Sequence, residues 1–134
     1  MGKAARLLSG ERKKRSQKVK LLGKKLAEGI LSLVDGARLM GHPEIRIPGI
    51  YTFLFPGVEG DSLLLNLDIK GAAASSGSAC SSHAIEPSHV LMALGLNAIE
   101  AGSCIRFSIG EFTTEVEIDE LLEILPPLVK KLKK

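Results

Sequence analysis

An apolar stripe within residues 10–34 constrains the fold of this chain more than any other feature. Its members recur at intervals of three or four residues, as on one face of a helix: Val19, Leu22, Leu26, Ile30 and Leu33. Asp35-Gly36 follows the stripe and predicts the end of the helix. Because such a stripe must be buried, the sequence predicts a long helix packed against a body formed by the rest of the chain.

Two apolar segments predict the main strands of that body. Residues 50–55 are rich in aromatic and β-branched side chains and lie between Pro48-Gly49 and Pro56-Gly57. Residues 103–109 alternate, so that Ile105, Phe107 and Ile109 share the core side while Cys104, Arg106 and Ser108 share the other. Residues 38–41 and 72–74 are shorter strand candidates.

Helices are predicted around these strands over 59–68 and over 87–94, the second ended by Gly95. Thr114 and Glu117 form a capping box that opens a last helix with the apolar stripe Ile118, Leu121, Leu122 and Leu125. Pro126-Pro127 is expected to break or kink it. The pattern predicts a single α/β or α+β domain over residues 1–134, in which helices cover a small sheet whose strand directions are left open.

Charge is distributed unevenly along the chain, although the formal net charge is only +3. Residues 1–25 hold ten Lys or Arg against one acid, residues 130–134 hold four Lys, and the segment between them is acidic. The run Arg12-Lys13-Lys14-Arg15 could contact nucleic acid or form a solvated helix face. Aromatic residues make up only 4% and none interleaves with the run, which favours the helix face.

Composition indicates a cytoplasmic protein. Two cysteines do not form a disulfide framework, which suits a reducing compartment. The apolar stretches are far shorter than the ~20 residues that span a bilayer, and no apolar signal segment opens the chain. No membrane association is expected.

The small-residue segment 75–82 holds Cys80 among Ser, Gly and Ala, a composition typical of a flexible coil. A nucleophilic thiol needs exposure and electropositive help, which His83 and the helix beginning at Pro87 could supply. The alternative is an inert, small cysteine in a loop.

Three further candidates follow from residue type. Arg106, at mid-strand, could hold a carboxylate with two hydrogen bonds, or could be a surface arginine paired with a nearby acid. A zinc site would need Cys80, His83, His89 and Cys104, but their spacing fits no common zinc pattern and Cys104 is predicted on a strand, so no metal is expected. His42 and His89 are interpreted as structural.

Four motifs, in order and spacing, resemble the NifS-like cysteine desulfurases of the class V aminotransferase type. They are residues 56–64 (PGVEGDSLL), 75–80 (SSGSAC), 86–91 (EPSHVL) and 105–108 (IRFS) with Gly110 and residues 112–115 (FTTE). Together they cover nearly the whole chain. The resemblance implies the small C-terminal domain of a fold-type I pyridoxal phosphate enzyme.

The resemblance also implies roles for two residues. Cys80 matches the loop cysteine that attacks the sulfur of L-cysteine held on pyridoxal phosphate, which releases alanine and leaves a persulfide. Arg106 matches the arginine that binds the substrate carboxylate. Both roles agree with a thiol on a flexible tether and a guanidinium on a strand. At the positions of Thr52 and Leu54 the family usually has Asn and Ser, so contacts from that strand are expected to differ.

The family's larger domain, with its Schiff-base lysine and phosphate cup, has no counterpart among these 134 residues. We therefore expect no firm pyridoxal phosphate binding and no desulfurase activity by this chain alone. Complete enzymes of the family are homodimers that pass sulfur to iron-sulfur scaffold or thiolation proteins, so such acceptors, a large domain and a second copy are the partners implied. A stand-alone persulfide carrier and a basic nucleic-acid-binding fragment are the alternatives.

Overall fold

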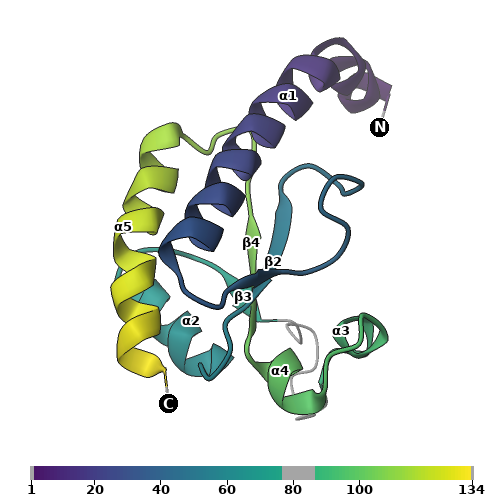
Figure 1. Ribbon diagram of the computed structural model, residues 1–134. Helices are drawn as coiled ribbons and strands as arrows, with labels where there is room; N and C mark the ends of the chain where they lie inside the picture. Colours follow the sequence, from purple (N-terminus) through teal and green to yellow (C-terminus); the bar gives the residue numbers. More distant parts are fainter. Residues whose placement is uncertain (1, 77–86, 134) are drawn as a thin grey trace.

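The computed structural model describes residues 2–76 and 87–133, except for the side chains of residues 3–11. Within these residues, four strands form one sheet in the order β1-β2-β4-β3 (Figure 1). They are β1 (Arg38–Leu39), β2 (Ile50–Leu54), β3 (Ser75–Ser76) and β4 (Cys104–Ser108). Every neighbouring pair is antiparallel, which settles the strand direction that the sequence left open.

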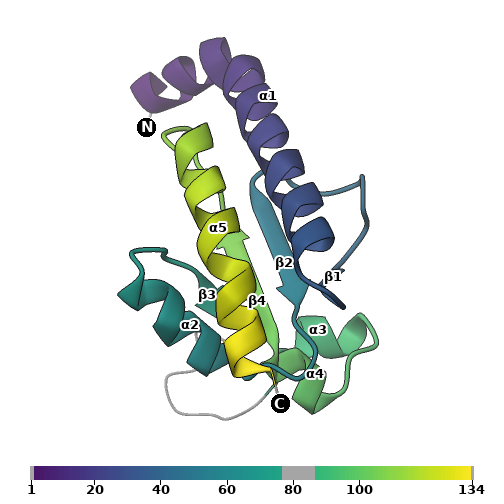
Figure 2. The same ribbon diagram turned by 60° about the vertical axis from the view of Figure 1, so that its left-hand side comes forward.

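The described part of the chain also forms five helices, which cover this sheet unequally (Figures 1 and 2). They are α1 (Gly2–Leu33), α2 (Gly60–Ile69), α3 (His89–Ala93), α4 (Ala98–Gly102) and α5 (Glu115–Leu132). Helices α1, α2 and α5 share one core with the sheet, in which Leu26, Phe53, Leu63, Ile105 and Leu125 are fully buried. Helices α3 and α4 contribute to a smaller apolar cluster of Leu54, Leu91, Leu96, Ala101 and Cys104. The predicted fold of helices over a small sheet is confirmed.

The register divides the strand residues between two faces of the sheet. Tyr51 lies opposite Phe107 and Phe53 opposite Ile105, and all four are buried on the side of α1, α2 and α5. The other side, here called the open face, carries Arg38, Ile50, Thr52, Leu54, Ser75, Cys104, Arg106 and Ser108. This assignment confirms the alternation predicted for residues 103–109. Leu54 and Cys104 are buried within the smaller cluster, whereas Ile50 and Ser108 are exposed.

Helix α1 is longer than predicted, because it begins at Gly2 and not near residue 10. Residues 3–8 are Lys, Ala, Arg and Leu, which are strong helix formers, and no proline precedes the stripe. At the other end the expected burial of Leu33 is wrong: it is 54% exposed, and Val34 is buried in its place. The chain leaves the helix there and turns at Gly36, which has a positive φ of 79°.

Three further predictions need correction. Residues 72–74 form no strand, because the Ala72 N–H donates to Leu67 O at the end of α2, and pairing begins only at Ser75. Helix α4 was not predicted at all. Helix α5 continues through Pro126 and Pro127, since Leu125, Leu128 and Val129 are buried on both sides of the prolines and hold the helix on the core.

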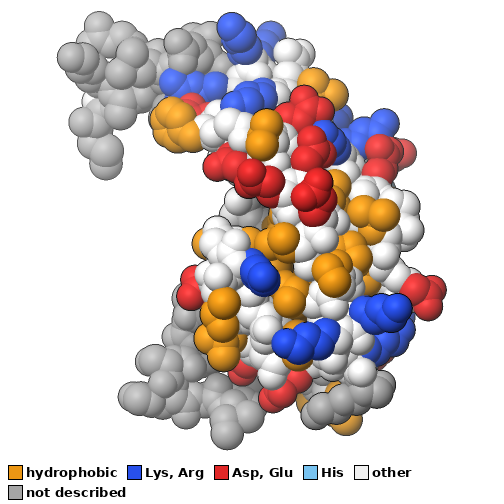
Figure 3. Space-filling model, turned by 90° about the vertical axis from the view of Figure 1, so that its left-hand side faces the viewer, with side chains coloured by type: hydrophobic (Ala, Val, Ile, Leu, Met, Phe, Trp, Pro, Cys, Tyr) orange, Lys and Arg blue, Asp and Glu red, His pale blue; other side chains and the backbone are white. Residues whose placement is uncertain are grey.

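Basic residues of α1 hold it against the beginning of α5. Arg15 pairs with Glu111 at 2.5 Å, and Lys18 donates to the backbone oxygen of Glu111. Lys25 bridges Glu115 and Asp119 at 2.7 and 2.6 Å. Acidic side chains gather over the upper half of the face shown in Figure 3. This part of the basic segment is therefore a helix face, as the low aromatic content favoured.

Among the described residues, no helix is both long and apolar enough to cross a membrane.

Candidate functional site

Arg106 lies in the middle of β4, between β2 and β3, with its side chain on the open face. Its partner on β2 is Thr52. Backbone bonds join Phe55 N–H to Ser103 O and Ile109 N–H to Gly49 O, so the pairs between them alternate and Thr52–Arg106 is a non-hydrogen-bonded pair. In such pairs the side chains approach most closely, so the Thr52 hydroxyl lies near the first carbon atoms of the Arg106 side chain.

Ser75 is the partner of Arg106 on the other side, at the edge strand β3. Since the backbone groups of Arg106 do not pair with Thr52, they point toward β3 and make Ser75–Arg106 a hydrogen-bonded pair. The chain then leaves β3 at Ser76 toward Cys80. Cys80 and His83 lie outside the described residues.

The guanidinium of Arg106 is partly buried and has no hydrogen bond or ion pair with any described residue. Arg38, on the same face, donates to Glu100 Oε1 at 2.7 Å. The alternative of a surface arginine paired with an acid therefore describes Arg38 and not Arg106 within this part of the chain. An arginine held on a strand with its fork unoccupied suits a ligand carboxylate.

Cys104 has a structural environment. It is 1% exposed, and its Sγ lies 3.4 Å from the backbone oxygen of Glu100. Burial, with a smaller contribution from the Glu100 charge, raises the pKa of the thiol to about 11. Cys104 is therefore neither a nucleophile nor an accessible zinc ligand at neutral pH, while His89 is exposed on α3. The described residues contain no cluster of three or more metal-ligating side chains.

Glu100 fixes α4 beside the open face. Its carboxylate accepts from the Asn97 N–H and from Arg38, and these bonds hold the pKa of Glu100 below its ordinary value. Asn97 in turn caps the helix by accepting from the Glu100 N–H. The sequence carried a signal for this element, because Asn followed three residues later by Glu is a capping box.

Leu54 and Thr52, the two residues that depart from the family pattern, lie in different environments. Leu54 is fully buried in the apolar cluster under α3 and α4, so it packs against Cys104 and Leu91 where a serine would offer a hydroxyl. Thr52 stays partly exposed beside Arg106 and keeps a hydroxyl at the open face.

The described residues do not fit pyridoxal phosphate. The cofactor aldehyde requires a lysine amine, and none of the open-face positions on the four strands is a lysine. The described lysines lie on α1, on α5 with its C-cap, and at Lys70 beyond α2. Arg106 could take a substrate carboxylate, but this part of the chain offers no amine beside it.

Comparisons of sequence and of structure with known proteins indicate the same family. Residues 1–121 match the family model described as Aminotransferase class-V. Cysteine desulfurase IscS 1 of Archaeoglobus fulgidus is 38% identical over 132 residues, which is 98% of this chain and 34% of that protein. Cysteine desulfurase NifS of Azotobacter vinelandii is 43% identical over 115 residues, 86% of this chain and 29% of that protein.

A solved structure of a NifS-like protein superposes with a TM-score of 0.79 at 26% identity, over 94% of this chain and 31% of that one. The chain thus spans about a third of the length of the relatives that it matches.

Proposed function

This chain belongs to the aminotransferase class-V family, and from that premise we propose that it forms the C-terminal, small-domain part of a cysteine desulfurase. Such an enzyme removes sulfur from L-cysteine for iron-sulfur cluster or thiolation pathways. The relatives named cysteine desulfurase support the reaction. The observation that supports the assignment to residues is the guanidinium of Arg106, which has no partner among the described residues and lies beside the strand that precedes Cys80 in the chain.

Arg106 binds the carboxylate of L-cysteine in this proposal. Its position on a central strand fixes the arm, and two parallel hydrogen bonds would orient the amino acid. The Thr52 hydroxyl, on the closest cross-strand position, is available to a second polar group of the substrate.

Cys80 receives the sulfur. Overall, the sulfur of L-cysteine becomes bonded to the Cys80 sulfur, the substrate's carbon–sulfur bond breaks, and that carbon keeps the electron pair and gains the proton that makes L-alanine. The thiol becomes a persulfide, and no external oxidant or reductant is needed. Cys80 follows Ser76 by four residues, and a fully extended chain of four residues spans at most roughly 13–14 Å.

Pyridoxal phosphate supplies the electron sink for this chemistry and would be held by the larger part of the complete enzyme. That part, a sulfur-acceptor or iron-sulfur scaffold protein, and a second copy in a homodimer are the partners of the proposal. A cytoplasmic location belongs to it as well.

The test combines the chain with the cofactor-bearing remainder of a desulfurase, expressed together or as one polypeptide. We expect L-cysteine to yield alanine, and mass spectrometry to find one added sulfur on the peptide that contains Cys80. Cys80→Ser should abolish both, whereas Cys104→Ala should preserve them. Alanine production that survives Cys80→Ser would refute the role of Cys80.

A second candidate is a stand-alone sulfur carrier, which the lack of a lysine on the described open face favours. In that case Cys80 accepts sulfur from a separate, complete desulfurase, and the chain needs no cofactor. The purified chain would gain sulfur from the complete enzyme and L-cysteine while producing no alanine itself. A visible cofactor absorbance in the purified chain would contradict this candidate.

A further inference from the structure

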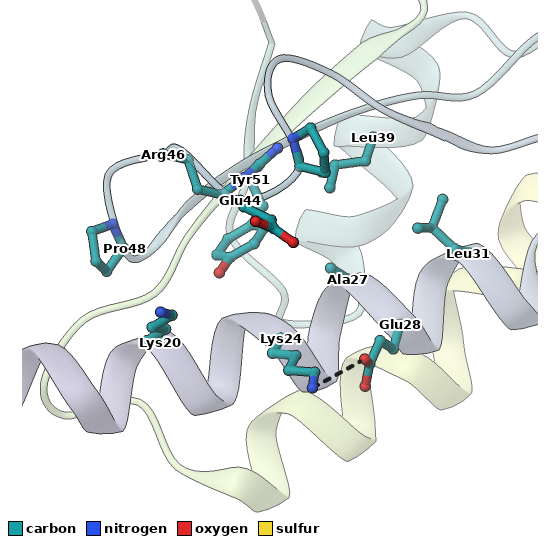
Figure 4. A pocket seen from close by; sticks show the side chains of 11 residues that line it. Lys20, Lys24, Ala27, Glu28, Leu31, Leu39, Glu44, Arg46, Pro48 and Tyr51 are labelled. Atoms are coloured by element: carbon teal, nitrogen blue, oxygen red, sulfur yellow. Dashed lines mark ion pairs between the residues drawn. The ribbon is translucent and has the colours of Figure 1, made fainter.

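An open groove of about 520 Å³ lies between α1 and the segment that joins β1 to β2 (Figure 4). It is on the helix-covered side of the sheet, whereas Arg106 is on the open face. Helix α1 forms one wall, the joining segment forms the other, and Tyr51 lies between them. The lining residues are Lys20, Lys24, Ala27, Glu28, Leu31, Leu39, Pro43, Glu44, Arg46, Pro48 and Tyr51.

The wall opposite α1 is held in place by its own hydrogen bonds. Arg46 donates to the backbone oxygen of His42 from Nε and Nη2, at 3.0 and 2.7 Å, and to Met40 O at 3.2 Å. His42 Nδ1 accepts from the N–H groups of Glu44 and Ile45, which gives this histidine a structural role. The groove is therefore already formed without a ligand, which lowers the entropic cost of binding.

Tyr51 gives the groove a polar group at its base. The residue is only 5% exposed, and Arg46 stacks 5.1 Å from its ring centroid. Its ring fits against Gly23, where any Cβ would lie 2.2 Å from Tyr51 Cε2. Figure 4 shows the hydroxyl directed toward α1, between Lys20 and Lys24. No described residue hydrogen-bonds to that hydroxyl, and no buried side-chain nitrogen or oxygen among the described residues lacks a partner, so the hydroxyl is accessible and can donate to a ligand in the groove.

The charges of the groove are arranged in two zones along α1. Lys20 is exposed and has no partner among the described residues, whereas Lys24 pairs with Glu28 at 3.6 Å. Beyond this pair the lining is apolar, with Leu31 46% exposed and Leu39 half-buried. One end therefore suits an acid and the other an apolar side chain.

We propose that this groove binds a segment of a partner protein that carries an acidic side chain followed by an apolar one. The carboxylate would accept from Lys20 and from the Tyr51 hydroxyl, and the apolar side chain would cover Leu31 and Leu39. Charge complementarity and the accessible Tyr51 hydroxyl, which has no partner among the described residues, are the reasons for this choice of occupant.

Nucleic acid and a second copy of the chain fit less well. The single aromatic ring of the lining is already covered by Arg46, so it cannot stack on a base. A second copy of the chain could offer the acidic residues of its α5. However, Glu115 and Asp119 already pair with Lys25 of their own molecule.

The test uses the full chain, labelled with ¹⁵N, and a fluorescein-labelled, acetylated and amidated peptide of Ser, Glu and Leu. We expect saturable binding that perturbs amides of residues 20–31 and 39–51. Replacing Glu by Gln in the peptide should weaken binding about tenfold, and replacing Leu by Ser should weaken it to a similar extent.

Variants of the protein test whether peptide binding depends on the groove or only on the overall charge of the chain. Lys20→Glu/Lys24→Glu should weaken binding about tenfold or more, and Tyr51→Phe should weaken it several-fold. Lys130→Glu/Lys131→Glu makes the same charge change at exposed positions on the last turn of α5 and should leave binding within about twofold. Circular dichroism and thermal unfolding would establish that each variant folds.

Three results would overturn the proposal. One is the absence of saturable binding at peptide concentrations of about 1 mM, which is the weak limit for a specific contact. Another is an equal loss of binding in both charge-reversal variants. The third is a stronger perturbation of the same amides by a single-stranded RNA oligonucleotide, or by self-association of the chain, than by the peptide.

Discussion

Ser75 and Arg106 are partners across β3 and β4, so the last described strand before Cys80 is paired with the strand of Arg106, whose guanidinium has no partner among the described residues. The pairing fixes where the segment leaves the sheet relative to Arg106. Backbone pairing between the edge strand β3 and its neighbour β4 thus holds Ser75 beside Arg106, the proposed carboxylate ligand.

Replacing Arg106 should weaken substrate binding in the enzyme assembled with its cofactor-bearing remainder. Arg106→Gln removes both hydrogen bonds to the carboxylate, and we expect the KM for L-cysteine to rise about tenfold to a hundredfold, which corresponds to about 1.5–3 kcal/mol. Arg106→Lys should recover only part of this loss, because an ammonium lacks the planar fork. Steady-state alanine formation measures both.

Arg38→Gln is the matched control for that experiment, since Arg38 lies on the same face but already pairs with Glu100. Its KM should stay within about threefold of the unmodified enzyme, because an exposed ion pair contributes little. If Arg38→Gln raised KM as much as Arg106→Gln, the carboxylate would not be bound specifically by Arg106.

The Cys104 thiol should resist alkylation at neutral pH. Its pKa is raised from an ordinary 9.0 to about 11, so at pH 8 its thiolate fraction is about a hundredfold smaller than that of an ordinary thiol. In the Cys80→Ser variant, iodoacetamide labelling should be slow, accelerate about tenfold per pH unit up to about 11, and become fast in urea. Rapid labelling of this variant at pH 7 without urea would contradict the burial of Cys104.

Local signals in the sequence predicted most of the fold. The stripe on α1, the alternation of β4 and the Thr114 capping box each depend on neighbours within a few residues, and the structure has all three. Pro126 and Pro127 gave a wrong local signal, because the burial of Leu125, Leu128 and Val129 depends on α1 and α2, which are distant in sequence. Strand order and direction also require knowledge of these distant contacts.

The candidate site was predictable in part. Placing Arg106 on the face away from the core required only the period of the strand, and the structure confirms that face. Its lack of a described partner could not be deduced, since Arg38 and Arg106 share that face and only one of them meets an acid. The groove at Tyr51 gave no sequence signal at all, because Gly23, Arg46 and Tyr51 come together only in the folded chain.

The capping box at the start of α5 should make stability depend on acid pH. Glu117 accepts hydrogen bonds from the Thr114 N–H and hydroxyl, and these bonds hold the pKa of its carboxyl below the ordinary 4.5. Because the folded-state pKa is lowered, this contribution is present above about pH 4.5 and is lost as the pH falls through the folded value.

Urea unfolding at several pH values measures this dependence. Glu117→Gln should be less stable than the unmodified chain near pH 7, and the difference should shrink as the pH falls below about 4.5 and the Glu117 carboxylate is protonated. Glu120→Gln removes an exposed carboxylate that has no partner among the described residues and should show no such difference. A Glu117→Gln deficit that is unchanged at low pH would mean that the carboxylate charge is not what stabilises the helix.

Replacing Gly23 should destabilise the fold through Tyr51. An alanine at 23 gains up to about 1 kcal/mol of helix propensity, but its Cβ would lie 2.2–2.4 Å from the Tyr51 ring, which is buried and covered by Arg46. We expect Gly23→Ala to lower the free energy of unfolding by about 1–3 kcal/mol, as overpacking does. Gly29→Ala is the comparison, because the nearest atoms to its Cβ would be the end of the Leu122 side chain, Cδ1, Cδ2 and Cγ, which can move. That variant should be close to neutral.

A double-mutant cycle shows whether the loss acts through the tyrosine ring. Tyr51→Leu removes the atoms that the new Cβ would meet, so Gly23→Ala should cost much less in the Tyr51→Leu background than in the unmodified chain. Chemical unfolding of the four proteins gives the coupling free energy, which should be about 1 kcal/mol or more. Additive effects, with no coupling, would mean that Gly23 is needed for some reason other than the close approach of Tyr51 to α1.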